Sequence, residues 1–265
     1  MPKIIWFTIL LINASSFAQQ PNPLLDGAAT ALHQKDTVRA IQLLEQFLTS
    51  EKSDSLSLAG IAVTCRLGEL YLRTNQHAVA EKIFLSGLKP VNPIWRYDFS
   101  HIAMDWRLAR AKMCENLSEI YLKRKNNERA LHYVNLANTV YLPFQHCGNG
   151  MNGYQTFLSL KFADVYLAIG DTAKAIQRLI DYLIKGEQYV DDVAEKLRSI
   201  LLANYSAAEI RKEIIKGIRR MQAVDLDDAY YRYYVTLFGH AVTYSGSTNK
   251  RRHKKFLLES RLRYF

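Results

Sequence analysis

The chain has few residues of the kinds that build disulfide-rich or fibrous proteins. Its 265 residues include 12 glycines, 6 prolines and 3 cysteines, and 49% of the residues are hydrophobic. An odd number of cysteines excludes a fully paired disulfide framework. The scarcity of glycine and proline excludes collagen-like and low-complexity chains. The composition therefore predicts a folded protein of one or two domains with a substantial core.

The sequence also lacks the short motifs that mark common active sites. It contains no HExxH, no GxSxG, no Walker-type glycine loop and no CxxC pair. Adjacent acids do occur, at Asp191 with Asp192 and at Asp227 with Asp228. Neighbouring helical residues point about 100° apart, so these pairs are interpreted as helix-start or surface carboxylates. We expect no enzyme activity, no metal and no cofactor; a hydrolase assembled from distant residues is the alternative.

No hydrophobic run near the N-terminus is long enough to span a bilayer, but a short one has the features of a leader. Lys3 precedes an apolar run from Ile4 to Ile12, and Ser16 and Ala18 make a small-x-small cleavage signal before Gln19. Residues 1–18 are predicted to be a signal peptide, so the protein is expected to be periplasmic or secreted. The alternatives are a buried N-terminal helix and an uncleaved anchor.

A spaced pattern of small and aromatic residues occurs four times. Its clearest copy, LGELYLRTNQHAVAEKIFLSG, contains Leu67, Gly68, Tyr71, Ala80, Phe84 and Gly87. The other copies contain Ala28, Ala40 and Leu44; Leu117, Ser118, Tyr121, Ala130, Val134 and Ala137; and Phe162, Ala163, Tyr166, Ala175 and Leu179. In each copy an alanine follows the small residue by twelve positions. Such a period predicts paired antiparallel helices that approach closely at the small residues.

Turn-forming residues separate the two halves of each copy. Asn75 and Gln76 interrupt one helical stripe, and Gly170 and Asp171 interrupt another. The prolines Pro90, Pro93 and Pro143 are expected to end second helices. Each helix hairpin leaves an apolar face that only a neighbouring hairpin can cover, so stacking is predicted.

This pattern resembles the tetratricopeptide repeat family over roughly residues 20 to 185. The resemblance implies an all-α solenoid of about four hairpins at residues 19–186, which acts as a binding scaffold. The steps between copies, 40, 50 and 45 residues, exceed the family period of about 34. Tyr182 stands where the second helix of the last copy should carry a small residue. An ordinary helical bundle is the alternative.

The family's concave groove is lined by one face of each first helix. The resemblance therefore implies that the partner, a protein or an extended peptide, contacts Glu69, Arg73, Lys112, Glu119, Lys123 and Asp164. Their mixed signs favour recognition by complementary charge. Members that clamp a peptide carboxylate use Lys and Asn where this chain has Cys65, Glu69 and Leu72, and Glu115, Glu119 and Leu122. A chaperone-tail adaptor is therefore not expected.

The cysteines allow two interpretations. Cys65 and Cys114 occupy similar places in adjacent first helices, so they form either a disulfide or two buried thiols. Cys147 lies beside His146 in the glycine-rich loop 143–153 and lacks the further ligands of a zinc site.

Residues 187–248 are predicted to cap the repeats. Val193 to Leu201 form one helix, and Ser206 with Glu209 forms a capping box for a second. The aromatic segment near 230–244 alternates as a strand or short hairpin does, although a helix capped by Asp227 also fits.

Positive charge is concentrated at the C-terminus. The formal net charge is +10, and seven of the basic residues lie in the tail, residues 249–265, against Glu259 alone. The repeat body is nearly balanced, which disfavours a nucleic-acid groove. The tail is predicted to be a solvated terminus. The alternative function is binding of envelope polysaccharide or a lipid surface through this tail and the aromatic segment.

Overall fold

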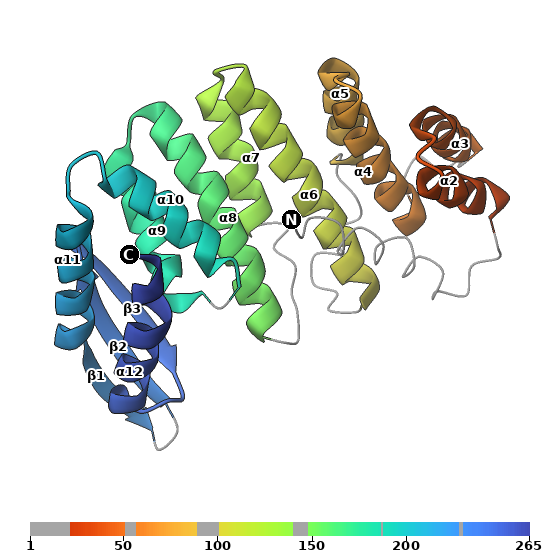
Figure 1. The fold of residues 1–265 in the computed structure, drawn as a ribbon. Helices are drawn as coiled ribbons and strands as arrows, with labels where there is room; N and C mark the ends of the chain where they lie inside the picture. Colours follow the sequence, from red (N-terminus) through yellow and green to blue (C-terminus); the bar gives the residue numbers. More distant parts are fainter. Residues whose placement is uncertain (1–21, 51–56, 89–100, 140–147, 187, 228–229) are drawn as a thin grey trace. The chain divides into compact units, whose positions relative to one another are not determined.

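The computed structural model describes residues 22–50, 57–88, 101–139, 148–186, 188–227 and 230–265 (Figure 1). The predicted signal peptide, the three helix-ending prolines and the His146–Cys147 pair lie outside these residues. The chain divides into two compact units, one of residues 1–123 with 135–144 and the other of residues 124–134 with 145–265. The predicted boundary at residue 186 falls inside the second unit.

The chain is mostly helical, as the sequence predicts. Four helix–turn–helix segments follow one another and correspond to the four copies of the pattern. They are α2 (Pro23–His33) with α3 (Thr37–Ser50), α4 (Leu58–Arg73) with α5 (His77–Gly87), α6 (His101–Lys123) with α7 (Asn127–Thr139), and α8 (Gly148–Ile169) with α9 (Thr172–Lys185).

The four turns share one backbone conformation. The residue seven positions after the small residue of each copy is left-handed, with φ of 62° at Lys35, 60° at Asn75, 59° at Lys125 and 88° at Gly170. In three turns the next N–H donates to the carbonyl five residues back at 2.8 Å, which is the bond pattern of a Schellman motif. The polypeptide therefore reverses direction at the same place in every copy.

The small residues lie at close contacts, as predicted. Ala40, Ala80, Ala130 and Ala175 are completely buried. A Cβ atom added to Gly68 would lie 2.3 Å from Cε1 of Phe84, so glycine is required where α4 crosses α5. Within the first unit, the repeat tyrosines also tie each first helix to the preceding hairpin. Tyr71 donates to Glu45 at 2.5 Å and Tyr121 donates to Glu81 at 2.6 Å.

The C-terminal part of the second unit combines helices with a small sheet. Its elements are α10 (Val190–Leu201), α11 (Ala207–Arg220), β1 (Gln222–Asp227), β2 (Tyr230–Leu237), β3 (His240–Gly246), α12 (Lys250–Arg261) and the 3₁₀ turn η2 (Leu262–Tyr264). The predicted capping box of Ser206 and Glu209 begins α11. Asp191 and Asp192 lie in the first turn of α10, in agreement with their interpretation as helix-start carboxylates.

The aromatic segment forms strands, which confirms the prediction made from its alternating pattern and rules out the helix capped by Asp227. The sheet is antiparallel with order β1-β2-β3. Tyr233, Val235 and Leu237 of β2 are buried on one face, while Tyr234 between them is 40% exposed. The strand β1 was not predicted, because its sequence QAVDLD carries acids at two of six positions.

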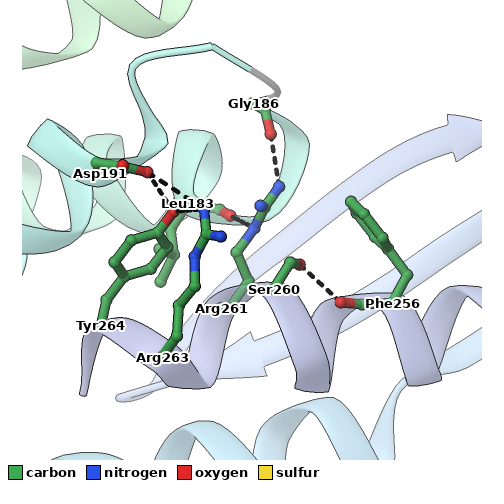
Figure 2. Close-up of polar contacts among 8 residues, drawn as sticks. All are labelled: Leu183, Gly186, Asp191, Phe256, Ser260, Arg261, Arg263 and Tyr264. Carbon is green, nitrogen blue, oxygen red and sulfur yellow. Dashed lines mark hydrogen bonds and ion pairs between the residues drawn. The ribbon is translucent and has the colours of Figure 1, made fainter.

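The prediction of a solvated C-terminal tail is wrong. Residues 250–261 form α12, whose N-terminus is capped by Asn249. Leu257 is completely buried, and Arg261 is 4% exposed. The guanidinium of Arg261 donates from Nε to the carbonyl of Leu183 at 2.7 Å and from Nη2 to that of Gly186 at 2.6 Å (Figure 2). The prediction counted Arg261 as one of the solvated charges of the tail. In the structure its guanidinium instead caps the carbonyls at the C-terminal end of α9.

A stack of rings joins α12 to the sheet. The ring of Tyr233 lies 5.1 Å from that of Tyr244 and 4.6 Å from that of His253, measured between centroids. The hydroxyl of Tyr244 is hydrogen-bonded to Nε2 of His253. Burial, reinforced by the positive charge of Arg261, lowers the pKa of His253. The folded unit therefore favours the neutral imidazole over the charged form.

We expect the second unit to lose stability as the pH falls below about 6.5, the ordinary pKa of histidine. Because the pKa of His253 is lower in the folded than in the unfolded chain, the unfolded chain binds the proton first. Each unit of difference in pKa contributes about 1.4 kcal/mol. Urea denaturation at pH 7.5, 6.5 and 5.5 should show this loss. The loss of stability at low pH should be smaller in His253→Gln. It should be unchanged in His33→Gln, which replaces an exposed histidine of α2. Equal slopes in both variants would contradict the assignment.

Candidate functional site

A charged cluster lies where α4 and α6 pack against each other in the first unit. From α4, Arg66 Nη1 pairs with Glu69 Oε2 at 3.3 Å, and from α6, Lys112 Nζ pairs with Glu115 Oε2 at 2.9 Å. The side chains of Arg66 and Glu69 are 17% and 15% exposed, and that of Glu115 is only 3% exposed. The side chain of Lys112 is 38% exposed. These four residues, called here the α4–α6 charge cluster, form two ion pairs in which only Lys112 keeps substantial contact with solvent.

The two pairs interact with each other electrostatically. Burial raises the pKa of Glu69, and the positive charges of Lys112 and Arg66 oppose this effect. Burial disfavours the charged form of Lys112, yet attraction by Glu115 and Glu69 outweighs it and raises the pKa of its ammonium group. The structure thus brings together two of the predicted binding residues, Glu69 and Lys112, from helices about 40 residues apart in the sequence.

Sequence reasoning missed Arg66 as part of this cluster and placed Glu115 only among the absent clamp positions. A signal for both was available. Arg66 lies three residues before Glu69, and Lys112 lies three residues before Glu115, which is the spacing of ion pairs along one helix face.

The other predicted binding residues of the first unit lie further along the same helices. Glu119 is half-buried on α6. Arg73 and Lys123 are exposed in the last turns of α4 and α6, where a cation also complements the helix dipole. Among the described residues, neither cation has a carboxylate within ion-pair distance. Both are therefore available to an acidic group of a partner.

Asp164, the last predicted binding residue, belongs to the second unit. On α8 it accepts from Lys196 Nζ of α10 at 2.5 Å, and the two side chains are 40% and 34% exposed. The sequence did not indicate this partner, because Lys196 follows the repeats and is 32 residues away. Asp164 is partly neutralised within its own unit.

The two described cysteines are buried and free. Cys65 of α4 and Cys114 of α6 do not form a disulfide, so the interpretation as core thiols is confirmed and the disulfide is not. Burial raises the pKa of both thiols; the charge of Glu115 raises it further at both positions, and the charge of Glu69 does so at Cys65. Protonated buried thiols are poor nucleophiles.

Within the described ranges, no group of three or more His, Cys, Asp and Glu side chains is placed to hold a metal ion. None of the helices in the part of the chain that the structure describes has the length and apolar character needed to cross a membrane.

Comparison with models of known families, with curated proteins and with solved structures finds no match to this chain.

Proposed function

We propose that this chain is a non-catalytic, exported scaffold of the tetratricopeptide-repeat type that binds a protein or an extended peptide. One observation carries the proposal. The left-handed turn and the buried alanine return at constant offsets in four successive helix pairs. Repeated hairpins of this kind expose one face of each first helix, and proteins built from them use that face for binding.

The charges on α4 and α6 support a partner of mixed sign. Glu69 and Lys112 each have an ion-pair partner on the same helix, so the cluster can hold its geometry without a ligand. Arg73 and Lys123 are exposed on the last turns of the same two helices. A segment with acidic groups would pair with these cations at the protein surface, where the charges stay partly hydrated in the complex, so the desolvation cost of binding is small. Such contacts increase specificity and the association rate more than affinity.

Reversal of the two free cations, Arg73→Glu with Lys123→Glu, is expected to weaken partner capture at least about tenfold, or 1.4 kcal/mol. The assay crosslinks the mature chain to its partners in native extract and quantifies each captured protein by mass spectrometry. The matched control is Lys82→Glu with Arg198→Glu, which changes the net charge equally at exposed positions of α5 and α10. If the two double variants reduce capture equally, or if neither reduces it, the first-helix face does not bind the partner.

The proposed export depends on the Lys3, Ile4–Ile12 and Ala18 pattern. We expect Gln19, partly cyclised, to be the first residue of the protein purified from its native source. Intact-mass measurement decides this point, and recovery of the chain with Met1 from cytosol would show that the leader is not cleaved.

A further inference from the structure

Most of the net positive charge of this protein lies on two neighbouring helices. α11 and α12 together carry eleven Lys and Arg residues against three Glu, a net of +8, compared with +10 for the whole chain. The sequence predicted a charged tail, but the charge is displayed on a folded surface.

Contacts between the two helices define that surface. Lys254 Nζ donates to the carbonyl of Arg219 at 2.6 Å, and Arg211 Nη1 donates to that of Leu262 at 3.1 Å. The start of α12 therefore lies beside the end of α11, and the helices run antiparallel. Both pack on the same face of the sheet, because Gly217 contacts Leu237 and His253 stacks on Tyr233 (Figure 1).

The outward side of this helix pair is cationic and largely unpaired. The exposed basic residues on it, called here the basic face, are Lys212, Lys216, Arg219, Arg220, Lys250, Arg251, Arg252 and Lys255. Glu213 pairs with Lys216, and Glu259 pairs with Lys255. Among the described residues, no carboxylate lies within ion-pair distance of Arg219, Arg220, Lys250, Arg251 or Arg252. Burial, together with the positive charge of Lys250, lowers the pKa of the neighbouring Lys254.

A partly exposed aromatic side chain borders the basic face. Phe256 is 48% exposed, follows Arg252 by one helical turn, and lies at the border between the basic face and the buried side of α12 (Figure 2). Its ring centroid is 5.4 Å from the guanidinium carbon of Arg261 and 6.2 Å from the ring centroid of His253. An anionic polymer would be held by the cations alone, whereas at a bilayer surface an aromatic ring enters the boundary between headgroups and acyl chains. Two helices side by side on a sheet also present a broad face rather than a groove, which suits an extended planar partner.

We propose that the basic face of α11 and α12 binds the surface of a bilayer that contains anionic lipids. Arg219, Arg220, Arg251 and Arg252 contact the headgroups, and Phe256 inserts among them. This inference is independent of the proposed binding by the first helices. Each basic residue near an anionic bilayer contributes about fivefold to binding.

The test is co-sedimentation of the mature chain with vesicles of phosphatidylcholine alone or with about one third phosphatidylglycerol. We expect binding to the anionic vesicles only. Arg251→Gln with Arg252→Gln should reduce it about 30-fold, and Lys82→Gln with Arg198→Gln, which changes the net charge equally, by less than about threefold. Phe256→Ala should weaken it several-fold with an unchanged circular dichroism spectrum. The proposal is overturned if both double variants bind alike, if Phe256→Ala binds as the parent does, or if dextran sulfate at equal charge displaces the chain completely.

Discussion

Arg261→Met is expected to destabilise the second unit by about 3–5 kcal/mol, because the guanidinium makes two buried, charge-assisted hydrogen bonds that methionine cannot replace. Methionine keeps most of the alkyl packing, so the loss reports the polar contacts. The carbonyls of Leu183 and Gly186 would remain buried without this donor (Figure 2). Because they belong to the end of α9, the variant should release α12 from the unit.

The matched control is Arg263→Met, two residues further on. Arg263 pairs with Asp191 at 3.6 Å, but its side chain is 62% exposed, so the change should cost no more than about 1 kcal/mol. Urea denaturation followed by circular dichroism measures both values, and trypsin cleavage after Arg251 and Arg252 reports release of α12. Equal stabilities of the two variants would show that the Arg261 contacts do not hold the terminus.

Gly217→Ala is expected to destabilise the same unit by about 1–3 kcal/mol, although alanine is the better helix former by about 1 kcal/mol. A Cβ atom at this position of α11 would lie 2.5 Å from the carbonyl oxygen of Thr236 and 2.3 Å from Cδ2 of Leu237. The carbonyl belongs to a strand in the middle of the sheet and cannot move aside alone. The helix must therefore shift away from the sheet.

Gly27→Ala of α2 is the control for helix propensity. Its Cβ atom would meet Cδ1 of Leu43 at 3.2 Å, the end of a flexible side chain, so we expect a change within about 1 kcal/mol of zero. Thermal unfolding of both variants measures the difference. A stabilised Gly217→Ala would mean that α11 does not lie this close to β2.

The local features of the fold could be predicted because their causes lie within a few residues. The turns at Asn75 and Gly170 follow from residues that tolerate the left-handed conformation, and the start of α11 follows from Ser206 and Glu209. Alternating hydrophobicity identified β2 in the same way. Lys35 and Lys125 show the limit of this reasoning. Both are left-handed at the equivalent turn position, although lysine has no preference for this conformation. Only the alignment of the four copies with one another predicts it.

The candidate site could be predicted in part. Helical period and the family resemblance placed Glu69 and Lys112 on first helices, but their mutual electrostatic contact depends on how α4 packs against α6. The pairing of Asp164 with Lys196 and the separation of Cys65 from Cys114 as free thiols likewise depend on packing. Periodicity gives the direction of a side chain around its own helix but not its distance from another helix.

By itself, the sequence of this protein determined the four helix pairs, the place of the turn within each pair, the start of α11 and the residues that must be small. Only the tertiary structure decided what the C-terminal residues do. Arg261 contacts carbonyls 75 and 78 residues earlier in the chain, and α12 covers a sheet whose first strand has no clear pattern. Such contacts form between residues that are far apart in the sequence and depend on how the elements pack. Basic residues that suggest a solvated tail in the sequence therefore form a helix that packs on the sheet.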